Sequence, residues 1–580
     1  MTPAAEIGSA PRNESRLRRL LPGAAMSGVT LLLAWAAFPP ADLAPLAWVA
    51  LVPWLILIGR QRPLRAGAWS LALGWAFFLL SIHWIRFVTP PGWIALAFYC
   101  GLYWAVAGVG IAWLRTRRVP VLLSAPLLIT ALELLRSRLL TGFPFIFMGH
   151  TQYRFLPIIQ VADLAGVYGV SFLVILVNAA IAEGVLSWRR RRALVLGGAA
   201  AALLLVVGAL TYGMMRLNAY QPRGEVTALL VQANIPQDIK HSNSYEDSDA
   251  LLRTHIDLTL QSRERPEIIL WPETMFPAPI NLVQDTDFIS RLLTYSNPDL
   301  SPKERAKREK DIHEYGAFLQ RCREALLEVA QRGGTTLLIG SETNDRETER
   351  RYNSAYLLTP QGNVLGRYDK IHLVIFGEYT PLLDALPFLK TFRPPEMGED
   401  LSPGIQRTLL DLPLKSGGTA RFGVTICYED ADADLFRRFV RDGAEFMVTL
   451  TNDGWFKDSS ELDQHLAVSV FRAVENRVGL ARDANTGISA IIDPLGRMKT
   501  LTLPDGRRRE VKGTLLGQVA LSNMRSFYTA RGDLFGLAVL AASGLLLFAA
   551  ALRRPEASVD EARDDQVDGD DQGKRGKGRK

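Results

Sequence analysis

The feature that most constrains this 580-residue chain is a series of eight long apolar runs. A helix needs about 20 predominantly apolar residues to cross the roughly 30 Å hydrocarbon core of a bilayer. The runs cover residues 21–39, 43–59, 66–88, 92–114, 119–139, 165–187, 193–213 and 533–552. One such run could be a buried core helix of a globular protein, but eight in one chain predict a multi-pass membrane protein.

Basic residues occupy alternate loops between these runs. They are Arg12, Arg16, Arg18, Arg19, Arg60, Arg62, Arg65, Arg115, Arg117, Arg118, Arg189, Arg190, Arg191, Arg192, Arg553 and Arg554, whereas loops 40–42 and 89–91 carry no Lys or Arg. Because positive charge is retained on the cytoplasmic side, both termini are expected in the cytoplasm and residues 217–530 outside it. The net charge of +7 therefore reports membrane topology and does not indicate nucleic-acid binding.

This pattern divides the chain into five parts. They are a cytoplasmic tail at 1–19, a seven-span membrane domain at 20–216, an extracytoplasmic domain at 217–530, a final span at 531–552 and a disordered cytoplasmic tail at 553–580. Glu133 and Arg136 lie inside the fifth run, where charges are costly. They could form an ion pair that fixes helix packing, or they could contact a lipid headgroup. Segment 140–164 is too broken to span and is expected at the membrane interface.

Residues 217–530 alternate short β-branched runs with amphipathic segments, which indicates a layered α/β domain. The predicted strands are 226–231, 268–271, 336–339, 355–358, 422–426, 446–450, 488–492 and 515–519. The predicted helices are 317–331 and 463–482. The charged stretch 284–315 is interpreted as a solvated insertion.

Three reactive side chains follow strand ends, where a rigid sheet commonly holds catalytic groups. Glu273 follows 268–271, Lys370 follows a run at 363–367, and Cys427 follows 422–426. The other two cysteines, Cys100 and Cys322, are expected to be buried small hydrophobes. Three cysteines exclude a disulfide framework.

Histidine offers two further alternatives for the chemistry. The seven histidines show no metal-ligand spacing, so no metal site is expected. A Cys–His pair between Cys427 and either His372 or His465 remains open from the residues alone.

Several motifs resemble those of the nitrilase (carbon–nitrogen hydrolase) superfamily, whose Glu, Lys and Cys occur in this order. They are Trp271-Pro272-Glu273, Tyr368-Asp369-Lys370, Phe376-Gly377-Glu378, Cys427-Tyr428-Glu429, the run 451–456 and the run 472–477. Residues 20–552 as a whole are similar to the apolipoprotein N-acyltransferase family of bacterial envelopes. The additional matching blocks are 140–144, 166–171, Asn178 and 231–237.

The chain departs from the family pattern at three places. Ile375 stands where a proline is common, His241 stands where a Trp is frequent, and the 284–315 stretch is longer than usual. The departure at His241 puts a stacking role at that position in doubt.

The resemblance implies an α-β-β-α sandwich domain that carries a Cys thioester. It makes Glu273 the general base, Lys370 the oxyanion-stabilising cation and Cys427 the nucleophile. Glu378 would support Lys370 or assist proton transfer, while Tyr428 and Glu429 would shape the pocket. These positions are read directly from the matching motifs.

The resemblance also implies the substrates and the location. A membrane phospholipid would donate the acyl group, and the diacylglyceryl-cysteine of an apolipoprotein would accept it. No cofactor is needed, because the route from ester through thioester to amide ends in the more stable bond. The enzyme would lie in the bacterial inner membrane with its catalytic domain in the periplasm.

Two other functions remain possible. A membrane-anchored amidase of the same superfamily would use the same residues and replace the acceptor amine by water. A transporter or scaffold whose external domain merely binds lipid would need no nucleophile at Cys427.

Overall fold

The computed structural model describes residues 11–553, apart from 241, 243, 263, 383–384, 394–398 and 523. Position 241, where the sequence departs from the family pattern, therefore lies outside the described residues, as do residues 1–10 and 554–580 of the two predicted tails. Helix α1 begins at Pro11, inside the predicted N-terminal tail.

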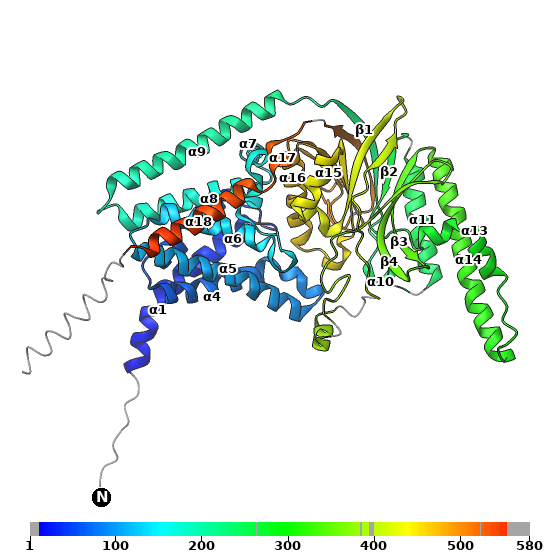
Figure 1. Cartoon of the computed structure of the whole chain (residues 1–580), viewed down its shortest axis with the longest axis horizontal. Helices are drawn as coiled ribbons and strands as arrows, with labels where there is room; N and C mark the ends of the chain where they lie inside the picture. Colours follow the sequence, from blue (N-terminus) through cyan, green and yellow to red (C-terminus); the bar gives the residue numbers. More distant parts are fainter. Residues whose placement is uncertain are drawn as a thin grey trace, which may run out of the picture.

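One half of the molecule is a bundle of apolar helices (Figure 1). Its helices are α1 (Pro11–Ala37), α2 (Ala47–Ala50), α3 (Val52–Ile58), α4 (Pro63–Ser81), α5 (Pro90–Thr116), α6 (Val121–Arg136), α7 (Leu156–Ile159), α8 (Ala162–Ser187), α9 (Arg192–Ala219), α17 (Phe527–Arg531) and α18 (Leu534–Ala551). Six of them, α1, α4, α5, α8, α9 and α18, are long and apolar enough to cross a membrane.

All eight predicted spans are helical, but two of them do not form a helix long enough to cross a membrane. The run at 43–59 is broken into a 3-10 turn, α2 and α3, with Pro45 and Pro53 at or near the starts of two of these elements. The run at 119–139 forms only the 16-residue helix α6, which ends at Arg136. The multi-pass architecture is confirmed, and the predicted number of eight spans agrees only approximately with the six helices of spanning length.

The other half is built on two six-stranded sheets (Figure 1). The first has the order β12-β1-β2-β3-β4-β5 and the second β11-β10-β9-β8-β7-β6. The strands are β1 (Gly224–Gln232), β2 (Ile268–Trp271), β3 (Thr336–Asp345), β4 (Arg350–Leu358), β5 (Val364–Asp369), β6 (Leu410–Pro413), β7 (Thr419–Ile426), β8 (Phe446–Thr451), β9 (Gly479–Ala484), β10 (Ala490–Ile492), β11 (Met498–Thr500) and β12 (Gly513–Leu521).

The sheets pack face to face, and helices cover their outer faces. In β1, Ala228 and Leu230 join the core between the sheets, whereas Leu229 and Val231 join a second core beneath the outer helices. This alternation follows the two-residue period of a strand. The outer helices of the first sheet are α10 (Gln237–Lys240), α11 (Tyr245–Gln261), α12 (Ile280–Gln284), α13 (Thr286–Leu293) and α14 (Pro302–Gly333). The predicted α-β-β-α sandwich is confirmed.

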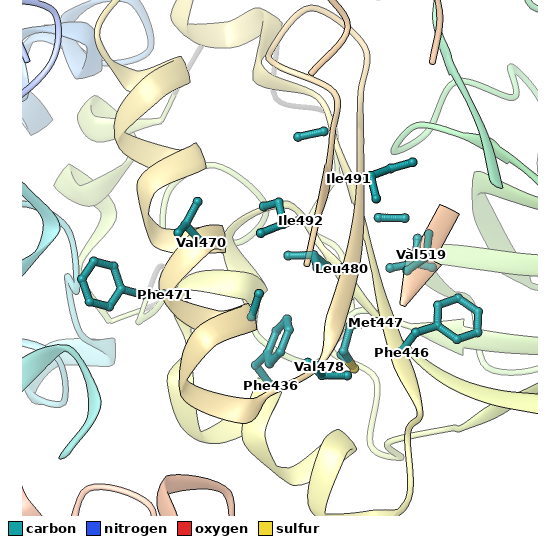
Figure 2. Close-up of a cluster of buried hydrophobic side chains, with 14 of the residues drawn as sticks. Phe436, Phe446, Met447, Val470, Phe471, Val478, Leu480, Ile491, Ile492 and Val519 are labelled. Atoms are coloured by element: carbon teal, nitrogen blue, oxygen red, sulfur yellow. The ribbon is translucent and has the colours of Figure 1, made fainter. Parts of the chain in front are cut away.

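Helices α15 (Ala433–Asp442) and α16 (Glu461–Asn476) cover the second sheet. Val470 of α16 faces the strands beside Ile492 and Leu480 (Figure 2). Phe471 points the other way, toward the helical half, where its ring lies 5.4 Å from that of His150. Helix α16 is therefore buried on both sides, between the second sheet and the membrane helices.

The structure corrects one prediction in this half and adds detail to another. The helix expected at 463–482 ends at Asn476, because Arg477 adopts the left-handed conformation (φ 53°) and β9 begins two residues later. The stretch 284–315, predicted to be a solvated insertion, is mostly helical, since α13 and the first half of α14 occupy most of it. Strands β6, β9 and β11 were not predicted, because two are very short and β9 carries buried charges.

Part of segment 140–164, predicted at the membrane interface, is enclosed by the protein. Its residues 145–153 are buried between the membrane helices and α16. Glu133 and Arg136 are buried as well and do not pair with each other in the described contacts. Both side chains bind backbone groups of this segment instead.

Candidate active site

The topology brings the three predicted catalytic residues together from two sheets. Strands β2 and β5 run in the same direction in the first sheet, so Glu273 and Lys370 leave at the same edge. Cys427 leaves the end of β7 in the second sheet. Because the sheets stack face to face, a carboxylate and an ammonium from one sheet meet a thiol from the other.

Glu273 and Lys370 form a buried charged cluster with Glu378. The Lys370 Nζ lies 3.5 Å from Glu273 Oε1 and 2.8 Å from Glu378 Oε2. Asn353 donates through Nδ2 to Glu273 Oε1 at 2.7 Å and to Glu378 Oε1 at 3.1 Å. The two carboxylates hold the pKa of Lys370 above its usual value despite burial, so the ammonium stays charged.

Cys427 occupies a strained turn at the start of a 3-10 segment, Cys427–Ala431. Its φ of 53° is unusual for a residue with a side chain, and such strain often occurs at functional sites. Burial, with the nearby Glu273 carboxylate, raises the pKa of the thiol to about 12, while Lys370 acts in the opposite direction. The resting thiol is therefore neutral, because burial outweighs the effect of the Lys370 ammonium. A base must remove its proton.

Glu429 ties the nucleophile turn to the loop that carries Lys370. Its fully buried carboxylate accepts hydrogen bonds from the backbone N–H groups of Ile371 (2.7 Å), His372 (3.0 Å) and Ile426 (2.8 Å). Tyr368 Oη donates to it at 2.8 Å. Glu429 thus holds the Lys370 and Cys427 segments in one arrangement, beyond the predicted shaping of a pocket.

A buried charged network supports the same turn from α16. His465 Nε2 donates to Asp430 Oδ1 at 2.7 Å, and Arg482 donates to Asp430 at 3.2 Å and to Asp453 at 2.9 Å. Asp430 lies three residues after Cys427. Asp453 follows Asn452, whose backbone N–H donates to Glu273 Oε2 at 2.9 Å. One network therefore fixes both the nucleophile turn and the segment that orients the carboxylate.

Three groups in this network could contact a metal ion, although the sequence predicted no metal site. Asp453, Glu461 and His465 bring their ligand atoms within 4.8 Å of one another. However, the Arg482 guanidinium lies 2.9 Å from Asp453 and 3.0 Å from His465. That cation already compensates the acidic groups, so these residues fit an internal ion-pair network better than a metal.

Neither candidate histidine hydrogen-bonds to Cys427 in the described structure. His372 Nδ1 contacts Asp432 Oδ2 at 3.0 Å, and His465 belongs to the network described above. Cys100 and Cys322 are buried, as expected.

Sequence reasoning missed Asn353, Asn452 and Lys240 at the site. Asn353 lies within the long strand β4, where nothing in the sequence distinguishes a bridging amide from a strand residue. Lys240 donates to Thr274, the residue after Glu273, and its pKa is lowered chiefly by burial. The signal for Asn452 was its place in the matching 451–456 run, but its backbone role was not predicted.

Comparison with known proteins identifies the family. Residues 31–180 match the apolipoprotein N-acyltransferase N-terminal domain, and residues 227–528 match the carbon–nitrogen hydrolase domain. The apolipoprotein N-acyltransferase of Geobacter metallireducens is 35% identical over 92% of this chain and 95% of its own length. The chain belongs to the apolipoprotein N-acyltransferase family.

More distant members of this family match over a similar extent. The apolipoprotein N-acyltransferase of Rhodopirellula baltica is 27% identical over 92% of this chain and 99% of its own length. Among solved structures, Saccharomyces cerevisiae Nit3 covers 54% of this acyltransferase and 96% of its own chain, at 20% identity and a TM-score of 0.33. The Nesterenkonia amidase covers 52% and 93%, at 19% identity and the same TM-score.

Proposed function

We propose that this acyltransferase moves a fatty acyl group from a membrane phospholipid to Cys427, and then to the N-terminal diacylglyceryl-cysteine of an apolipoprotein. The observation that carries the proposal is the convergence of the Cys427 turn with the Glu273–Lys370–Glu378 cluster from the facing sheet. That set supplies a nucleophile, a base and a cation, the three groups that acyl transfer through a thioester requires.

In the first half-reaction, Glu273 takes the thiol proton and the Cys427 sulfur attacks an ester carbonyl of the phospholipid. The Lys370 ammonium stabilises the oxyanion of the tetrahedral intermediate, because it is buried and already oriented by Glu378. The carbon–oxygen bond then breaks, and the leaving alkoxide takes the proton from Glu273. The products are a lysophospholipid and an acyl thioester on Cys427.

In the second half-reaction, the free α-amino group of the diacylglyceryl-cysteine attacks the thioester carbonyl. Glu273 accepts the proton that the amine loses, and the carbon–sulfur bond breaks to release an amide. The Cys427 thiolate leaves and takes that proton from Glu273, which restores both groups. Because an amide is more stable than the original ester, the sequence runs forward without a nucleotide.

The helical half suits lipid substrates. Extracting an acyl chain of about 16 carbons into water would cost on the order of 12 kcal/mol, at about 0.8 kcal/mol per methylene. A membrane-embedded enzyme avoids that cost, since both lipids can reach the site within the bilayer.

We place the enzyme in the bacterial inner membrane, with both termini in the cytoplasm and the 217–530 domain in the periplasm. Membrane segments at 20–216 and 531–552 flank that domain. The alternation of basic loops supports this orientation.

Intact mass spectrometry of the detergent-purified protein tests the proposal. Incubation with phospholipid should add one fatty-acyl mass to the wild type and none to Cys427→Ala. Hydroxylamine should remove the increment, and so should a diacylglyceryl peptide, which becomes N-acylated in return. Absence of the increment with every phospholipid would contradict the thioester route.

The same assay separates the remaining alternatives. A membrane-anchored amidase would lose the increment to water at the same rate with or without the acceptor peptide. A lipid-binding scaffold would retain phospholipid equally in the wild type and in Cys427→Ala.

A further inference from the structure

A buried arginine in the helical half holds a segment of chain that contacts the residue next to the proposed nucleophile. Arg136 lies in the last turn of α6 and is 3% exposed. Its guanidinium donates to three carbonyl oxygens, those of Phe143 (3.0 Å), Phe145 (2.7 Å) and Ile146 (3.1 Å). Few side chains other than arginine present enough donors in a rigid fork to satisfy three backbone acceptors at once.

Further contacts hold the same segment. Glu133, one turn earlier on α6, accepts a hydrogen bond from the backbone N–H of Met148 at 2.8 Å. The Arg136 guanidinium also lies over the rings of Phe78 and Phe147, at 5.1 and 4.7 Å from their centroids. This part of the chain has no regular structure, and Ile146 has a φ of 57°, so side-chain contacts largely determine its shape.

The clamped segment contacts the residue next to the nucleophile. The Phe145 ring stacks on that of Tyr428, with centroids 5.8 Å apart and planes at 18°. Phe143 stacks on the same Phe145 ring at 5.5 Å. Tyr428 Oη donates to the carbonyl oxygen of Gly142 at 3.0 Å. Tyr428 directly follows Cys427 in the chain.

We propose that Arg136 is a positioning residue for the Cys427 thiol, acting from the membrane half through the 142–146 segment and Tyr428. The guanidinium fixes the segment, the segment fixes the Tyr428 ring, and the ring limits movement of the strained Cys427 turn. The inference rests on the proposed role of Cys427 as nucleophile. It gives the helical half a part in the chemistry, in addition to holding lipid.

The experiment compares Arg136→Met, Arg136→Lys and wild type in detergent. The readouts are the single-turnover rate of acyl-mass gain on Cys427, the KM for phospholipid and the thermal midpoint. Arg136→Met should slow acyl gain by about 100-fold with little change in KM, since a displacement of about 1 Å at a reacting group costs on that order. Arg136→Lys should recover part of the rate, because it keeps one charged donor.

Arg115→Met is the matched control. Arg115 lies in α5 and pairs with Glu183 of α8 at 3.7 Å, so the same substitution perturbs an ion pair of the bundle elsewhere. It should leave the rate of acyl gain near that of wild type, even if the thermal midpoint falls as much as in Arg136→Met. A folded Arg136→Met protein with the wild-type rate would overturn the inference and leave Arg136 a packing residue.

If Arg136→Met does not fold, a second variant tests the same coupling. Phe145→Leu keeps the arginine clamp but removes the ring that stacks on Tyr428, so it should also slow acyl gain. An unchanged rate in Phe145→Leu would refute the coupling. These results are distinct from failure of the proposed function, in which the wild type itself gains no acyl mass.

Discussion

At the scale of single residues, the site combines a neutral thiol with a charged cation and a carboxylate. Burial raises the pKa of Cys427, and the Glu273 carboxylate raises it further, whereas Lys370 lowers it. In the proposed mechanism, the enzyme therefore keeps the Cys427 thiol protonated until Glu273 removes the proton. This arrangement protects the thiol between turnovers, because the thiolate is the form that oxidises and alkylates.

The opposing effects of the two charges predict opposite changes in thiol reactivity. Glu273→Gln should lower the pKa of Cys427 and increase its alkylation by iodoacetamide at pH 8 by about tenfold, while abolishing acyl transfer. Lys370→Met should raise the pKa and slow alkylation by about tenfold. Mass spectrometry of the alkylated peptide measures both rates. Slower alkylation in Glu273→Gln would contradict the assigned electrostatics.

At the scale of elements, α16 and the turns beside it form a rigid support for the site. Asp430 is fully buried and binds His465, Ser469 and Arg482. Removing its charge weakens all three contacts and leaves the buried Arg482 cation with one compensating carboxylate fewer, which is far more costly than losing an exposed pair.

Asp430→Asn should therefore destabilise the fold by about 3–5 kcal/mol. Asp411→Asn is the control, because Asp411 pairs with Arg421 at 2.9 Å and both side chains are about half exposed (52% each). That change should have little effect. Thermal unfolding in detergent compares the two variants. Equal midpoints would show that the buried network contributes nothing to stability.

Gly340 on β3 permits the close approach of the turn that carries Glu273. A Cβ at this position would collide with the Pro272 carbonyl oxygen and the Glu273 Cα. Gly340→Ala should push the carboxylate away and reduce acyl transfer by about 100-fold. Gly224→Ala, whose Cβ would meet only Leu521 at an ordinary 3.5 Å, should stay near wild-type activity. A steady-state assay of acyl transfer compares the two variants, and equal rates would contradict the role given to Gly340.

At the scale of the whole molecule, buried charges join the two halves. Arg477, at the end of α16, contacts Asp163 of α8 at 2.8 Å, and Asp163 also pairs with Arg216 of α9 at 3.1 Å. Glu475 accepts from the backbone N–H of Val167 at 2.8 Å. The catalytic domain is thus fixed to the membrane helices by specific contacts as well as by the covalent connections.

The proposed topology can be tested with introduced cysteines in a Cys100→Ser, Cys322→Ser, Cys427→Ala background. Ser416→Cys lies on an exposed turn of the catalytic domain, and Gln61→Cys lies in the basic loop between α3 and α4. A maleimide that cannot cross membranes should label position 416 in spheroplasts and position 61 only after permeabilisation. The reverse labelling pattern would show that the protein has the opposite orientation in the membrane.

Most of the architecture could be predicted from the sequence, because it depends on local patterns. Runs of about 20 apolar residues identify membrane helices whatever their neighbours are, and β2 was predicted with its observed bounds. The family motifs also located Glu273, Lys370 and Cys427 at strand ends. The exceptions were segments whose structure depends on distant partners, such as β9, where the buried charge of Arg482 concealed a strand.

The sequence by itself determined the membrane architecture, the α/β class and the residues available for chemistry, since apolar periodicity and motif order are properties of the linear chain. Only the tertiary structure decided the partners of the polar groups. Asn353 bridges two carboxylates, Glu429 gathers backbone donors, and Arg136 binds a segment beneath Tyr428. These contacts depend on side chains that meet only after the sheets stack and the bundle closes, because a buried polar group must be satisfied by whatever donor or acceptor the fold brings to it.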